Sequence, residues 1–124
     1  MPIPGFEHIE GLSERAVAKQ EVFISLLKAG SKESPIKSAY LQQKLGLGGG
    51  EIRGLSAYLT ELGMEVASRS GTGGGYWWAK TGAEMRLKVA QLKSRRQEIS
   101  LHINAAERVA ARLDCGMPLQ ERLI

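Results

Sequence analysis

The sequence predicts a mainly α-helical chain that carries one small β-hairpin and continues into a long helix. Apolar residues recur with helical spacing on both sides of a glycine-rich turn at 47–50. Two segments, 64–70 and 76–80, flank the glycine-rich stretch 71–75, and this arrangement is typical of two strands joined by a turn. From residue 81 to about 113 the helical period continues without a break.

Composition favours one compact domain with an extension. The chain has 124 residues, of which 43% are hydrophobic and 24% charged, and this balance is typical of a globular protein. The net charge of +4 favours a polyanionic partner only mildly. No apolar run approaches the roughly 20 residues that span a bilayer, and the N-terminus lacks the features of a signal peptide. We therefore expect a cytoplasmic protein without a membrane partner.

The first third of the sequence predicts an arm, a helix and a short strand. Residues 1–12 hold two prolines and two glycines, which predict an irregular N-terminal arm. Ser13 is suited to cap a first helix, whose apolar stripe continues to near Gly30. A loop at 31–34 follows. The segment 35–37 is expected to form a short strand at the edge of the hairpin, where proline is tolerated.

Two further helices are predicted around the glycine-rich turn. Ser38 is expected to cap the second helix, and the third helix is expected to cover 51–62 and to stop at Gly63. A turn at Gly46 would let the apolar side chains of both helices face one core. The residues assigned to this core are Leu41, Leu45, Leu47, Ile52, Leu55, Leu59 and Leu62.

This order of elements resembles the winged helix-turn-helix family of DNA-binding domains. The segment EVASRSGTGGGYWWAKT at 65–81 is similar to the wing of the biotin-repressor type, in which a short G-x-G-Y segment closes the hairpin. The resemblance covers 13–81, which we expect to form a winged helix-turn-helix domain. Outside this range, the residue pattern itself predicts an arm at 1–12, a long helix at 82–115 and a tail at 116–124. The residues at the apolar and glycine positions of the helix-turn-helix signature are Leu41, Leu45, Gly46, Leu47, Ile52 and Leu55.

The resemblance implies that double-stranded DNA is the partner. In this family the third helix enters the major groove, and the wing touches the adjacent minor groove or the backbone. Arg53 is the one side chain on the exposed face of that helix that is able to make a two-pronged contact to guanine. The implied contacts are Arg53, Ser56, Ala57 and Thr60 on the helix, with Lys37, Ser38, Lys44, Arg69, Ser70 and Thr72 near phosphates.

Three departures from the family pattern leave a second interpretation open. Gln42 stands where a small residue usually lets the two helices close, and Gly48–Gly50 replace the usual polar side chains that open the recognition helix. Glu51 would repel a phosphate beside them. The alternative is a winged-helix module that binds protein without sequence-specific DNA recognition.

Neither an enzyme nor a cofactor is expected. The glycine-rich segments match neither the dinucleotide-binding fingerprint nor the phosphate-binding loop of nucleotide hydrolases. Cys115 is the single cysteine, and it lies far in sequence from His8 and His102, so no metal-site spacing is present. No small-molecule ligand is indicated either. In the pair Trp77-Trp78, neighbouring strand residues point to opposite faces, so one ring is expected in the core and the other partly exposed.

The C-terminal helix predicts self-association. Its seam residues are spaced alternately by four and three, as in a coiled coil, and only Arg96 interrupts their apolar character. We expect a homodimer, acting as a bacterial or phage transcription regulator or as a replication or packaging accessory. The alternative is that the seam packs back on the first helix of its own chain. The two arrangements are compatible if 85–92 pack within the chain and 99–113 pair between chains. The residues assigned to the dimer are Ile99, Ile103, Ala106, Ala110 and Leu113.

Two features of this helix remain open from the sequence. Its basic cluster, which includes Lys88, is expected either to meet phosphate or to form a solvated face. The pairing of the two helices is either parallel or antiparallel, although Lys88 would face Lys93 of the second copy in the parallel case. Gly116 and Pro118 are expected to end the helix.

Overall fold

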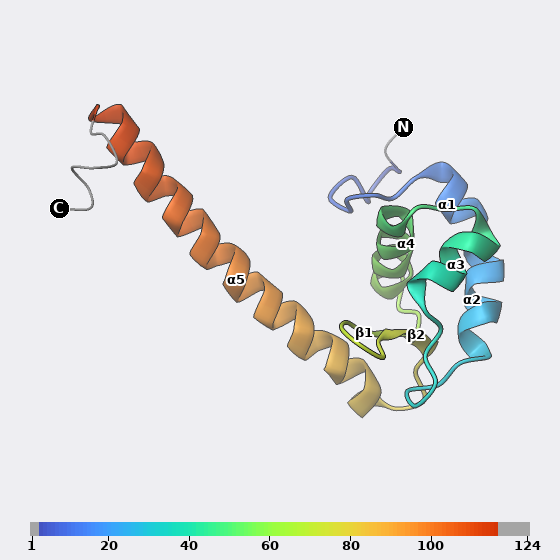
Figure 1. Ribbon diagram of the computed structural model, residues 1–124. Helices are drawn as coiled ribbons and strands as arrows, with labels where there is room; N and C mark the ends of the chain where they lie inside the picture. The colour runs from blue at the N-terminus through green and yellow to red at the C-terminus, as the bar shows by residue number, and fades with distance from the viewer. Residues whose placement is uncertain (1–2, 117–124) are drawn as a thin grey trace. The chain divides into compact units, whose positions relative to one another are not determined.

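The computed structural model describes residues 3–116 and is mainly helical, with a two-stranded antiparallel hairpin and a long C-terminal helix (Figure 1). By its internal contacts the chain divides into two compact units, with the boundary between Val89 and Ala90. The predicted domain boundary at Thr81 lies eight residues earlier. The elements in order are α1 (Glu14–Ala18), α2 (Gln20–Lys28), α3 (Ser38–Leu45), α4 (Gly49–Glu61), β1 (Val66–Arg69), β2 (Gly75–Trp78) and α5 (Gly82–Asp114).

The single helix predicted between Ser13 and Gly30 is divided in two. Ser13 caps α1 as predicted, because its hydroxyl accepts a hydrogen bond from the Ala16 amide at 3.2 Å. The helix is then interrupted at Lys19, whose φ of −96° and ψ of 7° depart from helical values. The apolar side chains of this predicted helix are not all buried, since Val22 is 52% exposed while Phe23 is fully buried.

The start of α3 differs from the prediction. Ser38 is the first helical residue, the cap position belongs to Lys37, and no side chain caps this end. The Ser38 hydroxyl instead accepts a hydrogen bond from the Gln42 side-chain amide at 3.1 Å. At the other end, Gly46 adopts φ +65° and terminates the helix, as the sequence predicted.

The helix α4 begins two residues before the predicted start at Glu51. Gly48 takes the extended cap position, and its N–H donates to the Glu51 carboxylate at 3.1 Å, so the turn is shorter than expected. Leu62 was placed in the core but is 47% exposed. The reason is its position at the end of α4, where Gly63 at φ +92° turns the chain away.

The core of the N-terminal unit lies among the first four helices and one face of the hairpin. Six of the seven residues assigned to it are buried; Leu62 is the exception. The buried members are Ala16, Phe23, Leu27, Leu41, Leu45, Leu47, Ile52, Leu55, Leu59 and Val66.

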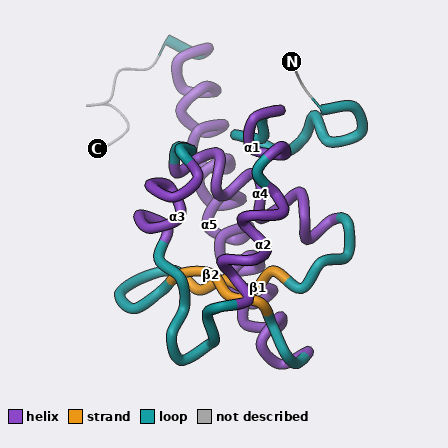
Figure 2. Tube along the Cα trace, turned by 90° about the vertical axis from the view of Figure 1, so that its right-hand side faces the viewer, coloured by secondary structure: helices purple, strands orange, loops and turns teal. Residues whose placement is uncertain are grey.

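The hairpin pairs β1 with β2 (Figure 2), and the register places Ala67 opposite Trp77. The strand predicted at 35–37 is reduced to one bridge, in which Ile36 and Tyr76 exchange backbone hydrogen bonds of 2.7 and 2.8 Å. Gly75 makes this bridge possible. A Cβ atom there would lie 2.5 Å from the Ile36 carbonyl oxygen, and the φ of +155° also favours glycine.

The two faces of the hairpin contact different clusters. Tyr76 and Trp78 pack against the helical core, whereas Trp77 is fully buried in a second cluster. The prediction that one tryptophan is buried and the other partly exposed is confirmed. The second cluster is formed by Ala67, Trp77 and Ala79, against which Met85 and Leu87 of α5 pack.

The helix α5 has 33 residues, and both of its ends lie within one residue of the prediction. At a rise of 1.5 Å per residue it is about 50 Å long. Gly116 adopts φ +72° and donates to the Leu113 carbonyl, as expected of a terminating glycine. The predicted role of Pro118 and most of the tail at 116–124 lie outside the described residues. Within 3–116, no helix combines the length and the apolar character that crossing a membrane requires.

Candidate nucleic-acid interface

The face of α4 predicted to meet DNA is narrower than the sequence suggested. Arg53 is exposed and Ala57 is partly exposed, as predicted. Ser56 is only 4% exposed, so its predicted place on the open face is wrong. Thr60 is partly buried and makes hydrogen bonds within the chain. Two side chains of the predicted set therefore remain accessible on this helix.

Lys88 of α5 covers one flank of α4. Its ammonium group donates to the Ser56 hydroxyl at 3.2 Å, to the Thr60 hydroxyl at 2.8 Å and to the Val66 carbonyl at 2.9 Å. An ammonium group has three donors, and here each has an acceptor. Lys88 was assigned to an exposed basic cluster, but it is buried within the N-terminal unit. Burial lowers its pKa to about 8, so it stays charged at neutral pH.

The N-terminal arm covers the other flank of α4. The His8 Nε2 atom lies 2.8 Å and 3.0 Å from the two carboxylate oxygens of Glu61. The ring of Phe6 packs edge-on against Tyr58, with centroids 4.8 Å apart. These contacts show that the arm, predicted to be irregular, lies against the helix.

A glycine in α4 allows this close approach of the arm. A Cβ atom on Gly54 would lie 2.7 Å from the Leu12 backbone nitrogen and 2.8 Å from the carbonyl carbon of Gly11. Real Cβ atoms do not approach backbone so closely, and the helix therefore needs glycine at this position. Between the arm and the Lys88 contacts, α4 thus presents an accessible strip that carries Arg53 and Ala57.

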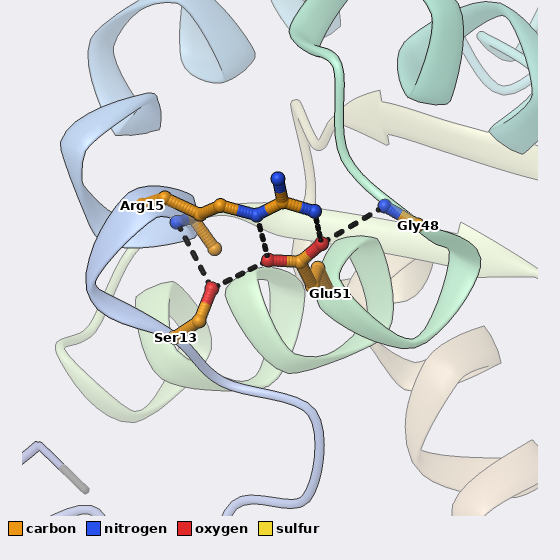
Figure 3. Close-up of polar contacts among 5 residues, drawn as sticks. Ser13, Arg15, Gly48 and Glu51 are labelled. Atoms are coloured by element: carbon orange, nitrogen blue, oxygen red, sulfur yellow. Dashed lines mark hydrogen bonds and ion pairs between the residues drawn. The ribbon is translucent and has the colours of Figure 1, made fainter. Parts of the chain in front are cut away.

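The first turn of α4 is fixed by a carboxylate (Figure 3). Glu51 accepts hydrogen bonds from the Ser13 hydroxyl at 2.6 Å and from Arg15 Nε and Nη2 at 2.8 and 2.6 Å. It also accepts from the Gly48 N–H. The network joins the start of α1 to the start of α4. Glu51 was expected to repel phosphate beside the glycines, but its charge is paired with Arg15.

We expect part of the protein's acid sensitivity to come from Glu51. Hydrogen bonds from Arg15, and then from Ser13 and Gly48, lower its pKa to about 2 from an ordinary value of 4.5. Because the folded-state pKa is depressed, the stabilisation is complete above about pH 4.5 and is lost as the pH falls towards 2. Urea unfolding of the wild type and of Glu51→Gln should show a stability difference that shrinks over this window.

Glu65→Gln is the matched control for this measurement, because Glu65 is exposed and precedes β1. No hydrogen bond or ion pair to the Glu65 carboxylate is recorded within residues 3–116, so the difference between Glu65→Gln and the wild type should depend less on pH than that of Glu51→Gln. A difference for Glu51→Gln that does not shrink between pH 4.5 and pH 2 would contradict the role given to the carboxylate.

The corner between α3 and α4 brings together several polar groups. A Cβ atom on Gly49 would lie 3.4 Å from Gln42 Nε2 and 3.8 Å from Arg53 Nη1. Both long side chains therefore border this glycine, and its lack of a side chain leaves room for Gln42 where a small residue is usual. Among residues 3–116, no hydrogen bond or ion pair is recorded for the Arg53 guanidinium. Lys37 and Lys44, near the two ends of α3, are also exposed.

The hairpin tip holds the remaining predicted contacts. The Arg69 guanidinium donates to the Gly73 carbonyl at 3.0 Å, so it is held against its own turn. Gly71 and Gly73 adopt φ values of +87° and +77°, which this tight turn requires. Ser70 and Thr72 are exposed on the turn.

Comparisons with known proteins add no relative. Protein-family models, curated proteins and solved structures were all searched, and none matches the chain. In the described part of the chain, no group of three histidine, cysteine or acidic side chains is placed to hold a metal ion.

Proposed function

We propose that residues 13–81 form a winged helix-turn-helix module that binds double-stranded DNA, in a dimeric bacterial or phage transcription regulator or a replication or packaging accessory. The observation that carries the proposal is the exposed position of Arg53 on α4. Arg53 is an exposed cation on α4, it borders the open glycine turn of that helix, and the described chain offers it no hydrogen-bond partner. A long cation in this position is suited to a base edge or a phosphate.

The order of the elements supports the same proposal. A short helix, a left-handed glycine turn, a second helix and an antiparallel hairpin follow one another in α3, Gly46, α4 and β1–β2. In winged helix-turn-helix modules, the helix after the turn is the one that enters the groove.

The structure narrows the proposed DNA contacts. The hydroxyls of Ser56 and Thr60 accept hydrogen bonds from Lys88, and the Ser38 hydroxyl accepts one from Gln42. We therefore leave these three residues out of the proposed DNA contacts. Few side chains remain that could read bases, and we therefore propose that backbone and shape contribute most of the recognition. The retained contacts are Lys37, Lys44, Arg53, Ala57, Arg69, Ser70 and Thr72.

Replacement of Arg53 by alanine is the direct test. We expect Arg53→Ala to weaken duplex binding by about 1–3 kcal/mol without changing thermal unfolding, because the side chain is exposed and makes no recorded bond in the fold. Fluorescence anisotropy with a labelled duplex at fixed salt would measure the affinity.

Two further variants make this titration specific. Arg53→Lys keeps the charge but not the fork of donors, so it separates phosphate binding from guanine recognition. Lys19→Ala removes an exposed cation from the break between α1 and α2 and should leave the affinity nearly unchanged. If the Arg53→Ala and wild-type affinities are equal, α4 does not carry the contact.

We also propose that α5 mediates a homodimer. In the single chain, Ile99, Ile103 and Leu113 are 52%, 50% and 64% exposed, and they follow the predicted seam. A run of large exposed apolar side chains usually marks an interface. Ala106 and Ala110 complete the same seam and are also exposed.

A second function is favoured by one observation. The arm and Lys88 cover the two flanks of α4, so only a narrow strip of the helix is accessible. Such a strip is better suited to contact a protein surface than to enter the major groove of DNA. Salt separates the two functions. DNA binding through several phosphates should weaken steeply from 50 to 200 mM salt, whereas a protein-binding module should not bind random duplex even at low salt.

A further inference from the structure

We infer that α5 binds α5 of a second copy in the antiparallel direction, with Ile103 facing Ala106 of the second copy. The inference rests on the self-association proposed above and adds the direction and register of the pair. It uses the part of the helix beyond Ala90, which belongs to the C-terminal unit.

The sizes of the seam side chains favour this register. In the antiparallel pair, Ile103 faces Ala106 of the second copy and Ile99 faces Ala110. Each layer then holds one large and one small side chain, so the layers have similar widths. A parallel pair in register would place Ile against Ile and Ala against Ala, and the spacing needed by the first layers would leave gaps in the others.

The arginine in the seam favours the same direction. A parallel pair would bring the two Arg96 side chains together inside the interface, where like charges repel and lose water. In the antiparallel register, Arg96 faces Leu113 of the second copy near the ends of the pair. Its apolar stem covers the leucine while the guanidinium reaches solvent.

On one flank of the seam, the charges are complementary in the antiparallel register. The residues that directly follow Leu92, Ile99, Ala106 and Leu113 of the seam are Lys93, Ser100, Glu107 and Asp114. Antiparallel helices pair these four flanking positions with one another. Lys93 therefore lies near Asp114 of the second copy at both ends, and Ser100 lies near Glu107. Lys88 does not enter this comparison, because it is buried against Ser56 and Thr60 of its own chain.

Cysteine cross-linking distinguishes the two directions. In a Cys115→Ser background, full-length Arg96→Cys and Leu113→Cys chains would be oxidised separately and as an equimolar mixture. In the antiparallel pair, two copies of position 113 lie about 26 Å apart along the axis, too far for a disulfide. We expect the yield of cross-linked dimer in the mixture to be at least tenfold higher than the yield from either variant oxidised alone.

Three outcomes would overturn the inference in different ways. Efficient cross-linking of Leu113→Cys alone would show a parallel pair, while the dimer itself would stand. A dimer in light scattering without a cross-link between positions 96 and 113 would show another register. A monomer in light scattering would remove the self-association on which the inference rests. Addition of Ile103→Asp should abolish the cross-link in the mixture, because it places a charge in the apolar seam.

Discussion

Replacement of Trp77 by alanine should lower the free energy of unfolding by about 3–5 kcal/mol. Trp77 is one of the largest fully buried side chains of the described residues. It fills the cluster between the hairpin and the first turns of α5, and its ring nitrogen donates to Glu84 at 2.7 Å. Alanine would leave a cavity and remove this hydrogen bond. Urea unfolding followed by circular dichroism would measure the loss.

The neighbouring residue is a matched control. Trp78 lies on the opposite face of β2 and is only partly buried, with the Lys28 ammonium 5.1 Å from its ring centroid. Trp78→Ala should therefore cost less than Trp77→Ala. Trp77→Phe keeps most of the ring and loses the donor to Glu84, so its free energy of unfolding should lie between those of the wild type and Trp77→Ala. Equal losses for both tryptophans would contradict the two-faced description of the hairpin.

Replacement of Lys88 by methionine should lower the free energy of unfolding by about 1–3 kcal/mol at pH 7. Methionine retains the length and the apolar packing of the side chain. It leaves the Val66 carbonyl and the Ser56 and Thr60 hydroxyls without their shared donor. Because Ser56 and Thr60 belong to α4 and Val66 begins β1, we expect the loss to appear in global unfolding.

The effect of Lys88 should also depend on pH. Its folded-state pKa is about 8 and its ordinary value 10.5, so the unfolded chain binds more protons between these two values. The stability of the wild type relative to Lys88→Met should therefore rise from pH 8 to pH 10.5, by up to roughly 3 kcal/mol. Other lysines titrate in both chains and cancel in the difference. A constant difference would show that the ammonium is not desolvated.

Local patterns in the sequence predicted most of the elements. Helical spacing located α3, α4 and α5, and the glycines at 46, 63 and 116 end helices or turn the chain at the expected places. The break at Lys19 was missed, because no proline or glycine marks it. The arm is irregular as predicted, since residues 3–12 form no helix or strand. Its contact with α4 was not predicted, because it depends on the missing side chain of Gly54, and a glycine inside a helix does not show what approaches it.

The candidate site was predictable only where neighbours in the sequence decide exposure. Helical position correctly placed Arg53 on the open face. Ser56 and Thr60 lie toward the same side, but their partner Lys88 comes 32 and 28 residues later in a charged stretch. The pairing of Glu51 with Arg15 spans 36 residues. The one local signal for it was the position of Glu51 three residues after Gly48, which is the spacing of a capping carboxylate.

The burial of Lys88 limits how this chain can be divided or recombined. A segment that ended at Thr81 would contain every helix and strand before α5, yet it would lack the donor for a strand carbonyl and two helix hydroxyls. It would also expose the face of Trp77 that Met85 and Leu87 cover. The smallest transferable module therefore includes the first two turns of α5. Any exchange of the C-terminal helix between chains would have to be made beyond Val89.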